Sequence, residues 1–280
     1  DQAGNAACGE GTFETGILHP EEWRARWIES TLLRPEIPCP PFWSLQSPVQ
    51  FEKEFYLDGK IASARLYATA HGIYRAYVNG LRPDDREFAP EHTVYDKILY
   101  YQTYPVEDLL RQGKNTLRFS VADGWYFCPQ TRQELSDGPG EPSVLFQLEI
   151  AYQDGRVQQV CSDGGEECFF GAIEYADLFL GEKRDDSRSE GHRRLVAPAR
   201  FPLKNLCAQP MEPVRPVKRI PARAAYRSPK GEWIVDFGQV LCGRARIRVD
   251  VPKGTELVFE YFEVTDREGN YRNTMIAPQK

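Results

Sequence analysis

Hydrophobic and polar residues alternate with a period of two along several stretches of this chain. Residues 51–56, 64–70 and 73–78 carry the pattern early in the sequence, and residues 115–121 and 144–152 carry it later. These stretches are rich in aromatic and β-branched side chains, and such alternation is typical of a strand that buries one face. The pattern therefore predicts a chain built mainly from β-strands.

Turn signals separate these strands. The Asn-Gly pair at 79–80 and the Asp-Gly pair at 154–155 each follow a predicted strand, and both pairs tolerate the positive φ angles of tight hairpin turns. A proline followed by acidic residues predicts a short helix at 20–23, and residues 107–113 predict one helical turn that ends at a glycine. No stretch sustains a helical period over several turns, so no longer helix is expected.

The same alternation returns near the C-terminus. Residues 245–251 place alanine, isoleucine and valines on one face and mostly arginines on the other. A turn at 252–254 precedes residues 256–262, which alternate again. The pattern predicts a hairpin with one wet face.

Proline and charge mark the expected domain borders. Residues 35–48 and 198–221 are rich in proline, which disrupts regular backbone hydrogen bonding, and residues 182–194 are dense in charge. We expect a lead-in and proline-rich connector over residues 1–50, a first β-sandwich over 51–197, and a linker with a second β-sandwich over 198–280. The predicted fold class is all-β, with two tandem antiparallel β-sandwiches of jelly-roll type.

Composition and charge exclude several classes of protein. Hydrophobic residues make up 41% and charged residues 27% of the chain, and the mean hydropathy is -0.54. These values predict a globular protein rather than a disordered or membrane-spanning one. The 35 Lys and Arg residues are scattered and are outnumbered by 41 Asp and Glu residues, so the basic surface that nucleic acid requires is missing. Neither nucleic acid nor a membrane is an expected partner.

The seven cysteines cannot form a complete set of internal disulfides, because their number is odd. Cys161 and Cys168 are the nearest pair in sequence, and a disulfide would require their Cα atoms to lie within about 7 Å. Thiols are therefore the expected state, which favours a reducing compartment. Residues 1–16 also lack the charged start and apolar run of a signal peptide, so a cytoplasmic location is favoured.

Several long motifs closely resemble bacterial α-L-rhamnosidases. In the first part of the chain they are FETGILHPEEWRARWI (13–28), SARLYATAHGIYRAYVNG (63–80), FAPEHTVYDKILYYQTYPVEDLL (88–110) and ADGWY (122–126). In the second part they are GEKRDDSRSE (181–190) and VDFGQVLCGRARIRVDVPKGTELVFEYFEVTDREGN (235–270). The motifs span nearly the whole chain in the family's order, which makes the resemblance far more specific than any short pattern.

The resemblance implies β-sandwich domains that precede a helical (α/α)6 barrel. In that family the barrel carries the acidic residues that hydrolyse terminal α-L-rhamnosides with inversion, a reaction that needs an acid and a base roughly 6.5 to 9.5 Å apart. The acidic motifs expected from the barrel do not occur here, so no catalytic residue is assigned. The resemblance also places residue 280 inside the second sandwich. That sandwich is therefore expected to be truncated, with an open sheet edge that favours self-association.

Three functions remain open at this point. The preferred one is the non-catalytic β-sandwich portion of an α-L-rhamnosidase, which supports the catalytic domain of the same polypeptide and holds carbohydrate. The second is a free-standing rhamnose-binding module with a concave aromatic site. The third is a complete hydrolase with two carboxylates in a sandwich cleft. The preferred function requires no cofactor.

Asp123, Trp125 and Tyr126 are the candidate carbohydrate-binding residues. An aromatic ring can stack on the C–H face of a pyranose while a neighbouring carboxylate accepts hydroxyl protons. The competing interpretation places both rings in the core at the end of a strand, which is the commoner location for such residues.

Asp84, Asp85 and Glu87 are the candidate metal ligands. Some rhamnosidases that resemble this chain bind rhamnose through a sandwich that holds calcium, and calcium prefers carboxylate oxygens. The spacing of these three acids matches no fixed calcium pattern, and an acidic hairpin loop is most often solvated. Calcium is therefore an alternative that the sequence leaves open.

Overall fold

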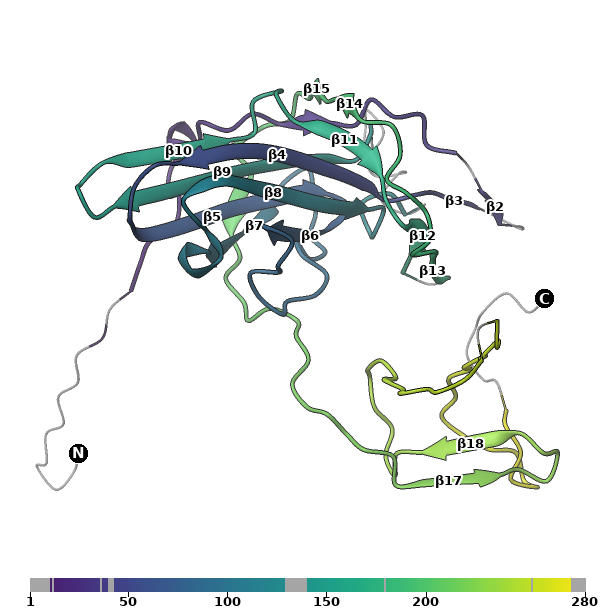
Figure 1. The fold of residues 1–280 in the computed structure, drawn as a ribbon. Coiled ribbons are helices and arrows are strands. Elements are labelled where there is room, and N and C mark those ends of the chain that lie inside the picture. The colour runs from purple at the N-terminus through teal and green to yellow at the C-terminus, as the bar shows by residue number, and fades with distance from the viewer. Residues whose placement is uncertain are drawn as a thin grey trace, which may run out of the picture. The chain divides into compact units, whose positions relative to one another are not determined.

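The computed structural model describes residues 11, 13–35, 37–39, 43–128, 140–178, 180–252 and 254–272. The chain forms two compact units, Asp1–Val214 and Arg215–Lys280. Apart from two short 3-10 turns, η1 (Pro20–Glu22) and η2 (Glu107–Leu109), the described secondary structure consists of strands (Figure 1). This confirms the predicted all-β class. Neither of the two described helical turns is long or apolar enough to cross a membrane.

Two sheets form the body of the first unit (Figure 1). The larger has the strand order β15-β1-β9-β5-β7-β16, with β10 also paired to β9. Its strands are β1 (Ile28–Glu29), β5 (Ile61–His71), β7 (Leu99–Pro105), β9 (Ser143–Tyr152), β10 (Val157–Cys161), β15 (Ala197–Pro198) and β16 (Leu206–Ala208). Its pairs are antiparallel except for β16, which runs parallel to β7.

The smaller main sheet is antiparallel and has the order β14-β11-β4-β8-β6. Its strands are β4 (Val49–Leu57), β6 (Ile73–Val78), β8 (Gly113–Ala122), β11 (Glu167–Phe170) and β14 (Arg194–Leu195). Two further pairs complete the first unit, β2 (Ile37–Cys39) with β3 (Trp43–Leu45) and β12 (Ile173–Asp177) with β13 (Gly181–Arg184).

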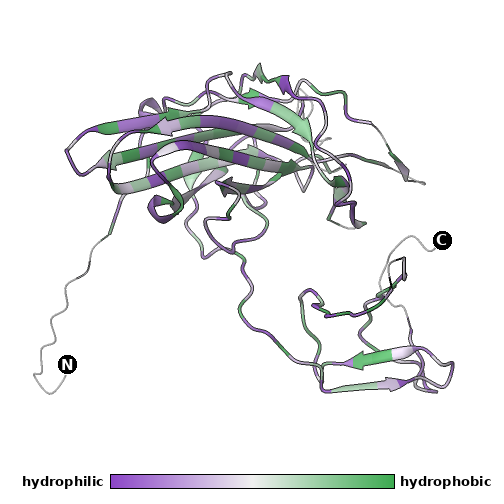
Figure 2. Ribbon diagram, viewed as in Figure 1, coloured by the Kyte–Doolittle hydropathy of each residue, from purple (hydrophilic) through white to green (hydrophobic). Residues whose placement is uncertain are grey.

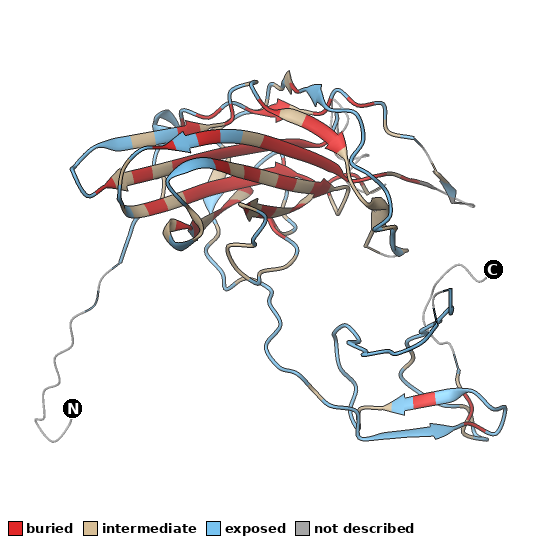
Figure 3. Ribbon diagram, in the orientation of Figure 1, coloured by how far each residue is buried: buried red, intermediate tan, exposed pale blue. Residues whose placement is uncertain are grey.

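The two main sheets face each other across a shared core. Phe119 on β8 stacks on Phe146 of β9 with 4.9 Å between ring centroids. Phe51 on β4 and Leu66 on β5 are fully buried in the same cluster. Burial alternates along β8 as the period-two pattern requires, and hydropathy varies in the same way along the strands (Figures 2 and 3). The first unit is therefore a β-sandwich.

The larger sheet is buried on both faces. Leu66 and Phe146 point into the sandwich, and their neighbours Tyr67 and Leu145 belong to a second buried cluster. Because side chains alternate along a strand, that second cluster lies on the opposite face of the sheet. Its other members include the segments around Trp23 and Trp27 and around residues 199–206. The sequence analysis grouped these segments with a lead-in and a linker, but here they cover the sheet.

Both predicted tight turns are present. Asn79 and Gly80 have φ angles of 51° and 81°, and Leu81 and Val78 exchange backbone hydrogen bonds of 2.9 Å across them. Positive φ at both central residues is the geometry that an Asn-Gly pair favours. Gly155, with a φ of 87°, closes the predicted turn between β9 and β10.

The second unit contains one described hairpin, β17 (Ala224–Arg227) with β18 (Trp233–Asp236). Ile234 is buried, whereas Ile247, Val249 and Phe259 are exposed. The described residues of 245–262 form no strand, so the predicted hairpin in this stretch is wrong for this structure. The alternation of hydrophobic and polar residues shows only which side chains could share one face of a strand. No described element of the second unit packs against that face.

Candidate functional site

The predicted sugar-binding residues follow a sharp turn at the end of β8. Gly124 has a φ of 57°, and a Cβ atom at this position would lie 2.4 Å from Cγ1 of Ile73. Both features require glycine. The turn therefore lets the chain pass closely over β6 and sets the directions of Asp123, Trp125 and Tyr126.

Tyr126 lies in the core. Its side chain is 3% exposed and packs against His71 at 4.4 Å, Phe127 at 5.0 Å and Tyr95 at 5.1 Å between ring centroids. Burial raises the pKa of Tyr126 to about 12. The ring is enclosed by other aromatic rings, so it offers no open face to a sugar.

Asp123 forms an ion pair with Arg34, whose side chain is almost fully buried. The Arg34 Nε donates a hydrogen bond of 3.1 Å to the backbone oxygen of Ser47, and its guanidinium lies 5.8 Å from the ring of Phe127. A buried arginine requires a compensating anion. Asp123 therefore helps to hold two distant segments of the chain together.

Trp125 is partly buried and packs against the buried cluster that contains Tyr126. Phe88 and His92 are both exposed and contact the Trp125 ring, at centroid distances of 5.8 Å and 5.9 Å. The structure thus separates the three predicted residues, with Tyr126 in the core, Asp123 in an ion pair and Trp125 partly buried at the edge of the core. Phe88 and His92 contact Trp125, and no pattern in the sequence indicated this.

The predicted metal ligands lie among arginines. Asp84 contacts the Arg86 Nε at 2.7 Å, and Glu87 contacts Arg75 at 2.7 Å and Arg82 at 3.1 Å. These guanidinium groups already neutralise the two carboxylates and would repel a divalent cation. Asp85 is exposed. No group of three potential metal ligands occurs in the described part of the chain, so this donor set does not fit calcium.

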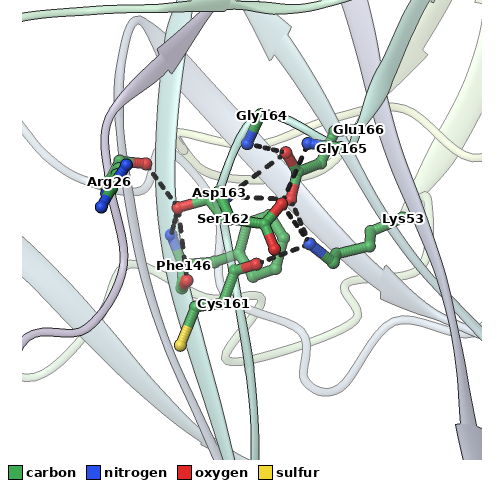
Figure 4. Close-up of polar contacts among 9 residues, drawn as sticks. All are labelled: Arg26, Lys53, Phe146, Cys161, Ser162, Asp163, Gly164, Gly165 and Glu166. Atoms are coloured by element: carbon green, nitrogen blue, oxygen red, sulfur yellow. Dashed lines mark hydrogen bonds and ion pairs between the residues drawn. The ribbon is translucent and has the colours of Figure 1, made fainter.

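A charged cluster joins β4 to the turn between β10 and β11, with Lys53 and Glu166 largely buried and Asp163 59% exposed (Figure 4). The Lys53 Nζ contacts Asp163 at 2.7 Å and Glu166 at 2.9 Å, and it donates a hydrogen bond of 2.8 Å to the backbone oxygen of Cys161. The Glu166 side chain is 0% exposed and accepts a hydrogen bond of 2.9 Å from the Gly164 amide. We call these residues, Lys53, Asp163 and Glu166, the lysine clamp.

The lysine clamp is closed to substrates. The three donors of the Lys53 ammonium point to three acceptors within the protein. Burial favours a lower pKa for Lys53, but the hydrogen bonds and charges of Asp163 and Glu166 outweigh it, and the pKa is raised. A lysine that is fully paired and charged supports the fold rather than catalysis. The sequence contains one indication of this cluster. Lys53 lies between Phe51 and Phe55 on the inward-facing side of its strand, where a charged residue needs a partner.

His71 and Ser143 form a second buried polar pair. The Nδ1 of His71 lies 2.8 Å from the Ser143 Oγ, and burial lowers the pKa of His71 to about 3. The imidazole is stacked on Trp27 at 4.4 Å and lies 4.1 Å from the Phe201 ring. With both polar groups buried, the pair is enclosed and cannot act as a nucleophile and base.

Cys161 and Cys168 are free thiols. The Cys168 Sγ lies 3.7 Å from the Thr31 Oγ1, and the Cys161 Sγ lies 3.8 Å from the Gln147 Oε1. Burial raises the pKa of Cys161 to about 11, so its thiol stays protonated. The expected thiol state is thereby confirmed for this pair.

Two hollows in the surface of the first unit each hold one carboxylate. One is lined by Asp84 together with Tyr74, Arg86 and Tyr104, and the other by Glu107 together with Lys60 and Arg111. Glu29 lies close enough to Glu141 for their charges to interact, and burial and this charge raise the pKa of Glu29. Neither of these acids lines the two hollows. Neither of these two hollows therefore brings two carboxyl groups face to face.

Two family models match the chain. The α-L-rhamnosidase N-terminal domain matches residues 59–218, and the bacterial α-L-rhamnosidase concanavalin-like domain matches residues 226–280. The first match begins after β4 and covers β5 to β16 with the segment that leads out of the sandwich. The second begins within β17 and covers β18 and the residues that follow it.

Individual proteins that resemble this chain are also α-L-rhamnosidases. An α-L-rhamnosidase from Streptomyces avermitilis is 34% identical over 250 residues, which cover 81% of this chain and 24% of that protein. The crystal structure of the α-L-rhamnosidase from Aspergillus terreus superposes with a TM-score of 0.68 at 31% identity and covers 81% of this chain and 27% of the other. That of a Streptomyces avermitilis α-L-rhamnosidase complexed with L-rhamnose gives a TM-score of 0.60 at 34% identity, covering 70% of this chain and 20% of the other. The chain thus spans about a quarter of the length of the relatives that it matches.

Proposed function

Because this chain belongs to the bacterial α-L-rhamnosidase family, we propose that it is a non-catalytic β-sandwich portion of such an enzyme. In this role it packs against the catalytic domain of the same polypeptide and supports it. The match of consecutive residues to the N-terminal and concanavalin-like domains carries the proposal. The proposed parent activity is the hydrolysis of terminal α-L-rhamnosides.

The ion pairs of the first unit support a non-catalytic role. The buried acid of the lysine clamp and the predicted metal ligands Asp84 and Glu87 are neutralised by lysine or arginine. A general acid in glycoside hydrolysis must instead keep a proton near neutral pH and face a second carboxylate across the scissile bond. Glu166, Asp84 and Glu87 therefore act in structural ion pairs, and we propose that the unit needs no metal.

The proposal predicts that the 280-residue chain does not hydrolyse p-nitrophenyl α-L-rhamnoside. Release of nitrophenol, followed by absorbance at high protein concentration, measures this directly. The matched variant is Glu29→Gln, because Glu29 and Glu141 are interacting acids with a raised pKa on Glu29. Turnover by the chain that Glu29→Gln abolishes would show a complete hydrolase and refute the proposal.

We also propose that the second unit associates with a second copy through its exposed apolar side chains. Exposed side chains of this unit include Trp233, Ile247, Val249, Phe259 and Tyr261, and such surface favours association. Sedimentation velocity should show an average mass that rises with protein concentration. Val249→Lys should shift the chain toward the monomer, whereas Val157→Lys, at an exposed site of the first unit, should leave the distribution unchanged. A single monomeric species at all concentrations would contradict this prediction.

A further inference from the structure

One end of the first unit carries a hollow that lies apart from the lysine clamp and from the predicted sugar-binding residues. Three connections meet there: the turn between β4 and β5, the segment from η2 to β8, and the turn between β9 and β10. The hollow has a volume of about 340 Å³, which lies within the range of roughly 300 to 1,000 Å³ that small-ligand sites occupy. We call it the cationic hollow, because Lys60 and Arg111 line it and both are exposed.

Hydrogen bonds hold the connections around the cationic hollow in place. The Gln153 amide donates to the Lys60 oxygen at 2.9 Å, which ties two of the turns together. The buried Asn115 side chain accepts a hydrogen bond of 3.0 Å from the Arg111 amide and donates one of 2.6 Å to the Arg111 oxygen. The backbone at Lys60 and Arg111 is therefore ordered before a ligand arrives, so binding costs little additional ordering.

Positive charge is in excess at the cationic hollow. Glu107 is the acid of its lining, and the Arg65 Nη1 contacts this carboxylate at 2.9 Å. Arg65 also pairs with the exposed Glu14 at 2.6 Å. With Arg65 and both acids counted, Lys60 and Arg111 leave an excess of one positive charge. The lining therefore favours a ligand with a single negative charge.

The guanidinium group of Arg111 is oriented without losing its charge. Its Nε donates a hydrogen bond of 3.1 Å to the backbone oxygen of Lys114, which is a neutral acceptor. The nearby acids Asp58 and Asp154 lie outside the lining, and both contact Arg156, at 3.0 Å and 2.9 Å. A planar guanidinium matches the geometry of a carboxylate, so a carboxylate is the anion that this hollow favours.

The rest of the lining suits hydroxyl groups and an apolar face. Gln112 and Gln153 are exposed, and an amide side chain both donates and accepts hydrogen bonds. Ile61 and Leu110 are partly buried and pack against the core of the sandwich, which gives the hollow a fixed apolar part. A ligand with one carboxylate, several hydroxyl groups and a C–H face matches all parts of this lining. Sugar acids combine these features in one ring.

We propose that the cationic hollow binds a hexuronate, with the carboxylate of the sugar between Lys60 and Arg111. The hydroxyl groups face Gln112 and Gln153, and the C–H face lies on the apolar part of the lining. The site and the ligand class rest on the lining alone and do not depend on the proposed function. A neutral hexose lacks the charge and acetate lacks the hydroxyl groups, so each binds more weakly than the hexuronate.

Amide-detected NMR of the nitrogen-15-labelled 280-residue chain, titrated with D-glucuronate at constant ionic strength, tests this site. The amide resonances of Lys60, Arg111 and Gln112 should shift saturably at millimolar concentration. Lys60→Gln and, separately, Arg111→Gln should each weaken the apparent Kd about threefold to fivefold. Lys97→Gln is the matched control and should leave the Kd unchanged, because Lys97 is exposed and precedes β7, whereas the hollow follows the end of that strand.

Four results would overturn the proposal. They are the absence of a saturable shift, a Kd that neither substitution changes, equal affinity for D-glucose, and equal affinity for acetate. The titration of the original chain requires no variant to fold, and both substitutions change only exposed side chains. Hydrolysis of the nitrophenyl rhamnoside would refute the proposed function without bearing on the cationic hollow. A non-hydrolytic chain that does not respond to D-glucuronate would refute the hollow alone.

Discussion

Lys53→Met is expected to lower the free energy of unfolding by about 3 to 5 kcal/mol, because it leaves the Glu166 carboxylate buried without its cation. Methionine retains most of the volume of the lysine side chain, so little of the loss arises from a cavity. Glu166 would keep the Gly164 amide as a donor, which cannot replace an ammonium group at 2.9 Å. Urea unfolding followed by tryptophan fluorescence measures the change.

A second ion pair in the same sheet provides the control. Lys114 on β8 pairs with Glu54 on β4 at 2.6 Å, but their side chains are 50% and 52% exposed. Lys114→Met should have a much smaller effect than Lys53→Met, because water screens an exposed pair. Equal effects of the two substitutions would contradict the interpretation of the lysine clamp.

A double-mutant cycle tests whether the loss of stability arises from the Glu166 carboxylate that is left buried and unpaired. Glu166→Gln removes the charge of the acid and keeps its shape, so the double variant Lys53→Met with Glu166→Gln should recover part of the loss. Recovery shows that the unpaired carboxylate causes the destabilisation. Additive losses would instead show that the two side chains act independently.

The stability of the first unit is expected to fall as the pH drops below 6.5. Burial among aromatic rings lowers the pKa of His71 from 6.5 to about 3. Between these values the unfolded chain takes up a proton that the folded chain does not. The contribution is therefore fully present above pH 6.5 and is lost toward pH 3, at up to about 1.4 kcal/mol for each pH unit.

Substitution of His71 isolates this contribution. His71→Gln keeps a polar partner for Ser143 and should flatten the dependence of unfolding free energy on pH between 6.5 and 5. Asp163 and Glu190, whose pKa values are lowered, lose their contribution only at more acidic pH. Glu29 and Glu91 have raised pKa values and act in the opposite direction. These groups remain in both proteins and cancel in the comparison.

An exposed histidine provides the matched control for this experiment. His192 lies at the surface, and His192→Gln should retain the pH dependence of the original chain. Denaturant unfolding at several pH values measures both variants. An unchanged slope in His71→Gln would show that the buried imidazole does not govern acid stability.

The alternation of hydrophobic and polar residues was sufficient to predict most strands of the first unit. Residues 73–78 and 115–121 alternate so regularly that their strands, β6 and β8, follow from period two alone. The Asn79-Gly80 turn is equally local, because both residues accept the positive φ that they show. The resemblance to α-L-rhamnosidases also rested on motifs read directly from the sequence, and the family matches confirm it.

The contact between Phe88 and Trp125 and the lysine clamp could not be predicted from the sequence. Phe88 and Trp125 are adjacent only because two different connections end beside each other in the folded unit. Lys53 meets Glu166 across β4 and the turn that leads to β11. The only local indication of either contact in the sequence is that Lys53 falls on the inward-facing side of its strand.

The sequence by itself determined the all-β class, the tight turns at 79–80 and 154–155 and the family, because each depends on residue order or on contacts between near neighbours. Only the tertiary structure decided that Tyr126 is core, that arginines neutralise Asp84 and Glu87, and that Trp125 meets Phe88 and His92. These outcomes depend on which distant segments share a face of a sheet. Burial and charge pairing are properties of that packing, and a linear pattern does not encode them.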